Sequence, residues 1–194
     1  MYLGKFHAPS ALATLAFDGR RGEFFRKELF NALKIIDEGH ISANNMKSGW
    51  AGAIGQAQFM PSSFLNYAQD WDGDGRKDLW GNEKDVFASI AFYLKSADWK
   101  NDITWGRQVL LPEDKNFLKL AKNKKYLTLR EWESLGVRNL DGSLLPERNL
   151  SARLITSETS KIAFLGYSNF DSILKWNRSI YFAASVGRLS DALR

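Results

Sequence analysis

The chain has 194 residues, of which 44% are hydrophobic and 25% are charged, and this is the composition of an ordinary folded domain. It contains no cysteine and only two histidines, which excludes disulfide bonds and cysteine-bound zinc and disfavours a histidine-rich metal site. The formal net charge of +5 suits an anionic polymer such as nucleic acid or acidic cell-wall material, although the scattered basic residues also fit a well-solvated surface. No apolar run approaches the ~20 residues that span a bilayer, and the first residues do not form a secretory signal.

The first half of the chain predicts helices. Residues 10–17 are rich in alanine and leucine and begin with a serine suited to the N-cap position, so we expect a helix there. A second helix should begin at Glu23 and end before Gly39, and apolar residues at helical spacing predict its buried face: Phe25, Leu29, Ala32, Leu33 and Ile36. Two further helices are expected at residues 61–69 and 85–96.

The second half predicts a mixture of helices and strands. Thr128 and Glu131 have the spacing of a capping box, which predicts the start of a short helix. Residues 153–156 and 161–165 are expected to pair as strands around a turn. The last segment, 169–193, is predicted as one long helix, and one stripe should form its buried face: Phe170, Ile173, Leu174, Asn177, Tyr181 and Ala184.

The most unusual stretch of the sequence runs from Ser48 to Trp80. It begins with small residues, which let the backbone approach a neighbour or a ligand closely. It continues as QFMPSSF over residues 58–64, where Pro61 suits the first turn of a helix. An ordinary core segment does not concentrate glycine, amide and carboxylate groups so tightly, and we therefore expect the functional site here.

This stretch ends in an acidic loop that matches positions 1, 3, 5, 6 and 9 of the calcium-binding loop of EF-hand proteins, with Asp70, Asp72, Asp74, Gly75 and Asp78. Position 12 of that loop, normally a glutamate, is Gly81, and the nearest carboxylates able to replace it belong to Glu83 and Asp85. The alternative is a turn with solvated carboxylates. We predict a weak, structural Ca²⁺ site whose ligands are the following: Asp70, Asp72, Asp74, Asp78 and the backbone carbonyl of Arg76.

A second set of candidates consists of neutral hydrogen-bonding side chains among aromatic residues, a combination that suits an uncharged sugar: Ser48, Gln58, Tyr93, Asn177 and Tyr181. Stacking surfaces for sugar rings are offered by Trp50, Phe59, Trp71 and Trp80. The alternative is that the aromatic residues are core and the polar ones cap helices. Cleavage of a glycosidic bond also needs a carboxylic acid with a raised pKa, and the sequence nominates no such residue among its glutamates.

Several segments together resemble the lytic murein transglycosylase B family. They are residues 11–25, the string GAIGQAQFMPSS at 52–63, DGDG at 72–75 before Leu79-Trp80, SIAFYL at 89–94, and residues 131–137 and 169–181. The likeness covers nearly the whole chain, and the string at 52–63 is its most specific part.

The resemblance implies an α+β, mostly helical, lysozyme-like transglycosylase core with a small mixed α/β insertion. We expect a single domain over residues 1–194, with a helical core from residues 1–99 and 166–194 and the insertion at residues 100–165. The resemblance also implies cleavage of the β-1,4 bond between N-acetylmuramic acid and N-acetylglucosamine without water, in which the muramyl 6-hydroxyl closes on C1 and gives a 1,6-anhydro product.

By the family pattern, the neutral polar set with Phe59 binds the substrate, and the acidic loop holds calcium. The catalytic glutamic acid of the family precedes a Gly-Lys pair that aligns with Gly4-Lys5, and here only three residues come before that pair. The family glutamate is therefore expected to lie upstream of Met1, and no catalytic residue is assigned. The alternative function is a non-catalytic peptidoglycan-binding or scaffold module.

The expected partners are peptidoglycan glycan strands, with no nucleic acid and no organic cofactor. The chain is expected to be a monomer in the periplasm or cell envelope of a Gram-negative bacterium, and any membrane anchor is expected in a segment upstream of Met1. A nucleic-acid binder rests only on the positive charge and would show affinity that falls steeply with salt.

Overall fold

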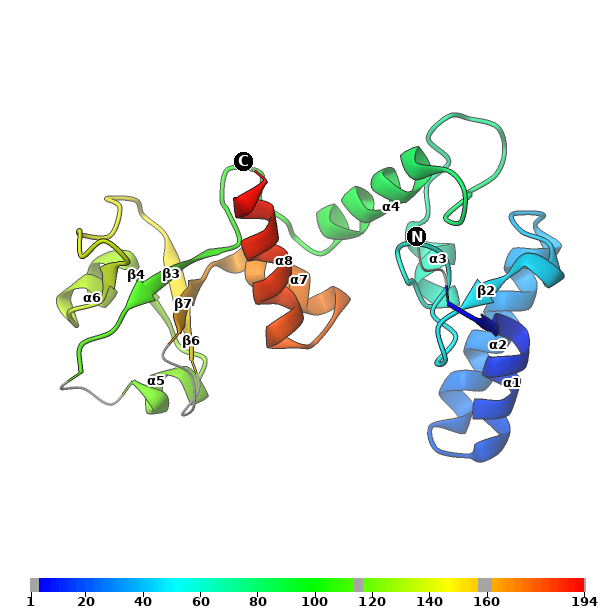
Figure 1. Cartoon of the computed structure of the whole chain (residues 1–194), viewed down its shortest axis with the longest axis horizontal. Helices are drawn as coiled ribbons and strands as arrows, with labels where there is room; N and C mark the ends of the chain where they lie inside the picture. The colour runs from blue at the N-terminus through cyan, green and yellow to red at the C-terminus, as the bar shows by residue number, and fades with distance from the viewer. Residues whose placement is uncertain (1–3, 114–116, 157–161, 194) are drawn as a thin grey trace. The chain divides into compact units, whose positions relative to one another are not determined.

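The computed structural model describes residues 4–113, 117–156 and 162–193 (Figure 1). The chain forms two compact units, and the division falls inside helix α4, between Tyr93 and Leu94. Helices dominate, and the strands of the larger sheet lie within residues 106–166, which confirms the α+β, mostly helical class. We predicted a single domain over residues 1–194. Whether the two units form one domain depends on how they are joined, so this stays a prediction. Among the helices in the described ranges, none combines the length and the apolar character needed to cross a membrane.

The first unit consists of helices joined by a compact turn region and a two-stranded sheet. Its elements are β1 (Phe6–His7), α1 (Ala8–Asp18), α2 (Gly22–Asp37), the 3₁₀ turn η1 (Ala43–Asn45), β2 (Lys47–Ser48), α3 (Pro61–Tyr67) and α4 (Glu83–Ser96). All four predicted helices are present. Helix α1 begins before the predicted Ser10, because Pro9 lies in its first turn and the Ser10 hydroxyl hydrogen-bonds the ring of His7 instead of capping the helix.

The buried face of α2 differs from the predicted one. The residues that are buried are Phe25, Glu28, Ala32 and Ile35, whereas Leu33 is 46% exposed. Hydrophobicity alone selected Leu33 for the interior, but the side of the helix that packs inward carries a glutamate. This glutamate is tolerated because its carboxyl group accepts hydrogen bonds from the backbone N–H and the hydroxyl of Ser62, at 2.8 and 2.6 Å.

The second unit is a five-stranded antiparallel sheet with helices, in the strand order β4-β6-β7-β3-β5. Its elements are β3 (Gly106–Leu110), α5 (Leu118–Lys122), β4 (Tyr126–Thr128), α6 (Leu129–Ser134), β5 (Arg138–Asn139), β6 (Ser151–Ile155), β7 (Ala163–Gly166), α7 (Ser168–Trp176) and α8 (Ile180–Ala192). The predicted strand pair is confirmed as β6 and β7, and its connecting residues lie outside the described ranges. The capping box of Thr128 and Glu131 is also confirmed.

The prediction of one helix over residues 169–193 is wrong, because the segment forms two helices, α7 and α8. Asn177 leaves the helical conformation, and its side-chain oxygen accepts a hydrogen bond from the backbone N–H of Ser179 at 3.0 Å. The Ser179 hydroxyl then caps α8 by accepting from Phe182 N. Asparagine and serine side chains that bond the nearby backbone in this way compete with a continuous helix. The predicted buried stripe therefore breaks, and Tyr181 is 81% exposed.

Candidate functional site

The first unit gathers part of the predicted sugar-binding set around the turn that precedes α3. Phe59 is buried, and its ring lies 5.7 Å from the ring of Tyr93, centroid to centroid. Tyr93 in turn meets Tyr67 edge to face at 4.7 Å. Gln58 is exposed beside this aromatic cluster. Tyr67 was not among the predicted site residues, although its place on α3, six residues from Pro61, was visible in the sequence.

The conformation of this turn depends on close packing. Gln58 has a φ of 50°, in the left-handed region that non-glycine residues rarely adopt, and its side-chain amide donates to the Gly55 carbonyl oxygen at 2.8 Å. Gly55 also has a positive φ of 65°, and a β-carbon there would lie 2.7 Å from that of Leu79. Ile54 and Phe59 exchange backbone hydrogen bonds across the turn. The small-residue tract therefore holds Gln58 in one defined position.

The remaining predicted sugar-binding residues are placed differently. Ser48 is completely buried, and its hydroxyl points toward the Phe6 carbonyl oxygen at 3.4 Å. Asn177 and Tyr181 lie in the second unit, at the exposed junction between α7 and α8. Among the predicted stacking residues, Trp80 is buried and donates to the Lys47 carbonyl oxygen, so it belongs to the core. The structure thus brings Gln58, Phe59 and Tyr93 together in one unit.

The acidic loop brings three carboxylates together. One oxygen each of Asp70, Asp72 and Asp85 lies within 4.8 Å of the others. Asp85, the residue considered as a replacement for loop position 12, is completely buried and joins the two ends of the loop by accepting from Trp71 N and Asp78 N, both at 2.8 Å. Carboxylate oxygens converging in this way are the ligands that Ca²⁺ prefers, so the donor set fits a hard cation.

The other two predicted carboxylate ligands, like Asp70 and Asp72, accept hydrogen bonds from the backbone of the loop. Asp74 accepts from Arg76 N, and Asp78 accepts from Trp80 N and Gly81 N, all at 2.8–2.9 Å. Neither belongs to the close group of three in the described ranges. Their side chains shape the loop, and the carboxylate that completes the group comes from α4.

His40 connects the acidic loop to the end of α2. Its Nδ1 accepts a hydrogen bond from Lys77 N at 3.1 Å, and its backbone oxygen accepts from the Arg76 side chain. The ring packs on Phe64 of α3, with 5.5 Å between centroids. Burial, together with the positive charge of Lys77, lowers the pKa of His40. The neutral ring that this favours is the form that can accept the Lys77 hydrogen bond.

The fold and these sites agree with one class of protein. The family model described as "Transglycosylase SLT domain" matches residues 1–191, and the chain belongs to this family. It is 32% identical over 194 residues to the membrane-bound lytic murein transglycosylase B of Escherichia coli (strain K12), covering 98% of this chain and 52% of that protein. The chain therefore spans about half the length of this curated relative.

Two solved structures show the same relationship. SltB3 from Pseudomonas aeruginosa, in complex with NAG-anhNAM-pentapeptide, has 40% sequence identity and a TM-score of 0.93 over 98% of this chain and 51% of that one. The Escherichia coli lytic transglycosylase Slt35, in complex with calcium, has 29% identity and a TM-score of 0.81 over 98% of this chain and 60% of that one. These neighbours confirm the family resemblance and the lysozyme-like transglycosylase fold.

Proposed function

We propose that this chain binds the glycan strands of peptidoglycan as part of a lytic transglycosylase. The observation that carries the proposal is the site beside α3, where an exposed Gln58 is held in a left-handed conformation directly before Phe59, whose ring packs on that of Tyr93. Amide groups beside aromatic faces suit an uncharged sugar, which needs hydrogen bonds and an apolar surface but no ion pair. Family membership and the saccharide ligands of the SltB3 structures support the same substrate class.

The proposed reaction is the one implied by the family. A glutamic acid protonates the glycosidic oxygen, then acts as the base that removes the proton of the muramyl 6-hydroxyl as that oxygen bonds to C1. In the first unit, Glu28 is buried and bonded to Ser62, and Glu23 is exposed on α2, so neither is assigned as the acid.

The acidic loop is proposed to bind Ca²⁺ through Asp70, Asp72 and Asp85, with Asp74, Asp78 and the Arg76 carbonyl as further candidates from the sequence pattern. The calcium complex of Slt35 supports this choice of cation. A bound Ca²⁺ would offset the repulsion of the three carboxylates and hold the loop against the start of α4. Its proposed role is structural, because the buried Asp85 carboxylate already joins the two ends of the loop to the start of α4.

The test combines binding and product analysis. The chain is incubated with purified peptidoglycan sacculi, sedimented with them, and the soluble fraction is searched for 1,6-anhydromuropeptides by mass spectrometry. Sedimentation without products is the expected result. Sedimentation with products would show that this chain contains its own acid, and failure to sediment would contradict glycan binding.

A matched pair of variants locates the site. Gln58→Gly removes the amide side chain while accepting the positive φ, and it should weaken chito-oligosaccharide binding about tenfold, or 1.4 kcal/mol. Asn66→Ala, an exposed amide on α3, should leave the affinity unchanged. Equal affinities for both variants would place the glycan elsewhere.

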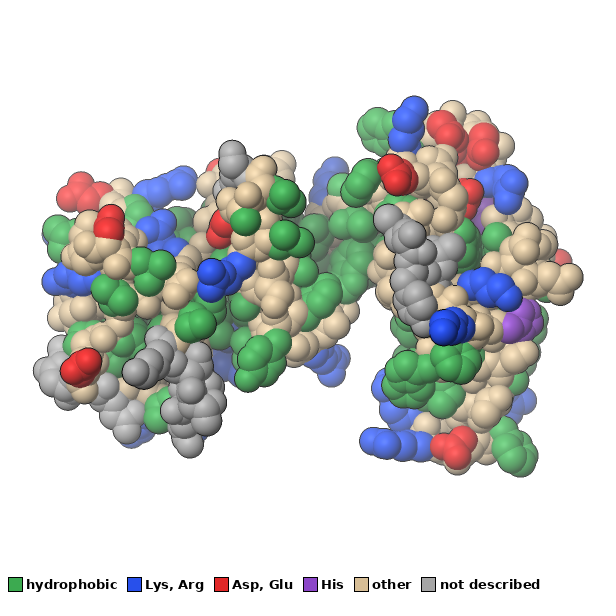
Figure 2. All heavy atoms as spheres, viewed as in Figure 1, with side chains coloured by type: hydrophobic (Ala, Val, Ile, Leu, Met, Phe, Trp, Pro, Cys, Tyr) green, Lys and Arg blue, Asp and Glu red, His purple; other side chains and the backbone are tan. Residues whose placement is uncertain are grey.

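The non-catalytic module remains the second candidate. It predicts the same sedimentation but no anhydro product even when the chain is extended upstream by a family-like Glu-containing segment. Nucleic-acid binding is not favoured, because basic and acidic side chains are interspersed on the face shown in Figure 2 instead of forming one basic patch.

A further inference from the structure

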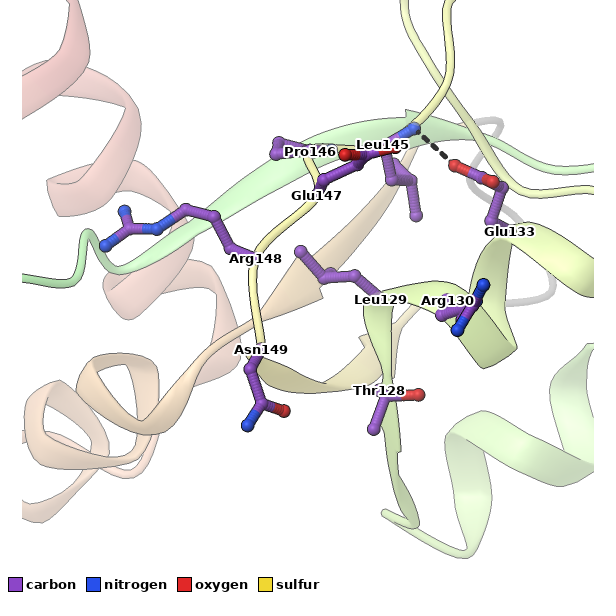
Figure 3. A pocket seen from close by; sticks show the side chains of 9 residues that line it. All are labelled: Thr128, Leu129, Arg130, Glu133, Leu145, Pro146, Glu147, Arg148 and Asn149. Atoms are coloured by element: carbon purple, nitrogen blue, oxygen red, sulfur yellow. Dashed lines mark hydrogen bonds between the residues drawn. The ribbon is translucent and has the colours of Figure 1, made fainter.

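A cavity of about 540 Å³ lies within the second unit, between the start of α6 and the segment that precedes β6. Figure 3 shows Arg130 and Glu133 on the α6 side and Glu147, Arg148 and Asn149 on the facing segment. The volume is in the range of sites that bind small ligands. None of its lining residues belongs to the proposed glycan site or to the acidic loop.

The floor of the cavity is apolar and firmly held. Leu129 and Leu145 are 2% and 4% exposed and belong to the core under the sheet. The Leu129 N–H donates to the Leu150 carbonyl oxygen at 3.0 Å, and the Leu145 N–H donates to the Glu133 carboxylate at 3.0 Å. These two hydrogen bonds connect opposite walls, so the shape of the cavity is built into the fold.

Two of the charged side chains that line the cavity have no partner among the described residues. The Arg130 and Glu147 side chains make no hydrogen bond or ion pair with any residue of the described ranges, although Glu133 is three positions from Arg130 on the same helix. Arg148 makes one long contact, 3.4 Å, with the Asp102 carbonyl oxygen.

Two other arginines of the same unit, both at least half-buried, have side-chain partners. Arg153 makes two hydrogen bonds to Asp171, and Arg107 bonds the Tyr167 hydroxyl and the Asn139 side chain. Structural arginines of this unit thus have partners at 2.6–3.0 Å, and those at the cavity are available to a ligand.

The lining selects the class of ligand. It contains no aromatic residue, so it lacks the flat surface on which a sugar ring stacks. It contains two arginines and two glutamates, and the glutamates would repel a phosphate or a nucleic acid. A ligand with carboxylates and an amino group on a short, partly apolar chain satisfies both signs of charge, and guanidinium groups pair with carboxylates in two parallel hydrogen bonds.

We propose that this cavity binds the peptide portion of peptidoglycan, with Arg130 and Arg148 facing its carboxylates and Glu147 facing its amino group. The choice of peptidoglycan as the source of the peptide rests on the proposed function. The site beside α3 and this cavity would then recognise different parts of peptidoglycan, the glycan and the peptide.

The test uses the whole chain and two separate probes. One probe is the sugar-free peptide released from peptidoglycan by an amidase, and the other is a peptide-free chito-oligosaccharide, each followed by calorimetry and by amide NMR shifts. The peptide should shift the amides of residues 128–149 and leave those of residues 54–60 unmoved. Arg130→Gln, an exposed substitution, should weaken the peptide at least tenfold and leave chito-oligosaccharide affinity unchanged.

Controls identify the charge pairing. Arg26→Gln, an exposed arginine on α2, should bind the peptide like the unaltered chain. Converting the peptide carboxylates to amides should reduce its affinity for the unaltered chain but have little further effect on Arg130→Gln. Acetylation of the peptide amino group should likewise reduce the affinity for the unaltered chain and have little further effect on Glu147→Gln.

The outcomes separate this inference from the proposed function. Three results would overturn the inference, whatever the glycan does. The peptide could fail to bind, it could bind Arg130→Gln as well as the unaltered chain, or its amide NMR shifts could fall only outside residues 128–149. Loss of chito-oligosaccharide binding alone would contradict the glycan site and leave the peptide cavity supported. Binding of inorganic phosphate in preference to the peptide would also overturn the inference.

Discussion

Replacing Glu28 tests how the start of α3 is held in place. Its side chain is 3% exposed in the middle of α2, and both carboxyl oxygens accept hydrogen bonds from Ser62, one from the backbone N–H at 2.8 Å and one from the hydroxyl at 2.6 Å. Ser62 lies at the first turn of α3, where backbone N–H groups have no partner within the helix. Glu28 therefore acts as a cap supplied by another helix.

The expected cost follows from these two bonds. Glu28→Ala leaves two donors of Ser62 without a protein partner, and an unpaired buried donor costs about 1–3 kcal/mol. Because Ser62 is only half-buried, water replaces part of the loss, and we expect about 3 kcal/mol in total. For a chain of this size that corresponds to a fall in Tm of roughly 6–12 °C.

The assay combines thermal unfolding with hydrogen exchange of residues 61–67. Glu28→Gln keeps one accepting oxygen and should cost less than Glu28→Ala. Glu23→Ala, an exposed glutamate at the start of the same helix, should cost at most about 1 kcal/mol through the helix dipole. In a Ser62→Ala background, Glu28→Ala should cost less than in the unaltered chain, because only the backbone N–H remains to be unpaired.

One result would refute this reasoning. The free energy of unfolding of Glu28→Ala could lie within about 0.5 kcal/mol of that of the unaltered chain, which is the range of ordinary surface substitutions. The Ser62 contacts would then not hold α3 in place. The same conclusion would follow if Glu28→Ala and Glu23→Ala were equally destabilising.

Three further changes should have measurable effects. Gly187→Ala should destabilise the second unit by about 1–3 kcal/mol in urea unfolding, because a β-carbon there would lie 2.2 Å from the Trp105 ring. Burial, with the hydrogen bond to Asp171, raises the pKa of Tyr126 to about 12. Because the phenol ionises at lower pH in the unfolded chain, the stability of the fold should decrease as pH rises from about 10 to 12. The decrease should be smaller in Tyr126→Phe. About 10 mM Ca²⁺ should stabilise the chain by roughly 1.4–2.7 kcal/mol if Kd is 10⁻⁴–10⁻³ M, and Asp72→Asn should abolish the rise in Tm.

Each of these changes has a matched control. Ser185→Ala on the exposed side of α8 should leave stability within about 0.5 kcal/mol, and an equal loss for both α8 variants would argue against the Trp105 contact. Tyr181→Phe, at an exposed phenol, should retain the alkaline loss that Tyr126→Phe reduces. Sodium chloride at the ionic strength of the calcium sample should not raise Tm, and a Ca²⁺ effect that survives in Asp72→Asn would contradict the loop site.

Local sequence determined the parts of the structure that depend on neighbouring residues. The capping box of Thr128 and Glu131, the glycine after α2 and the pairing of β6 with β7 were all predictable, because caps, turns and strand alternation involve residues a few positions apart. The family resemblance was equally local, since the string at residues 52–63 carries it.

Tertiary structure decided which polar groups are buried and which are gathered into a site. The sequence marked Leu33 for the interior and did not include Glu28 in the predicted buried face, but burial of a carboxyl group depends on a partner, and Ser62 is supplied by another helix. Asp85 completes the group of carboxylates because α4 packs its first turn against the acidic loop. The helix over residues 169–193 broke where Asn177 and Ser179 bond the backbone. Hydrophobic spacing records only how apolar each residue is. The burial of Glu28 and the position of Asp85 depend on donors supplied by another segment, and the break between α7 and α8 depends on polar side chains that bond the nearby backbone.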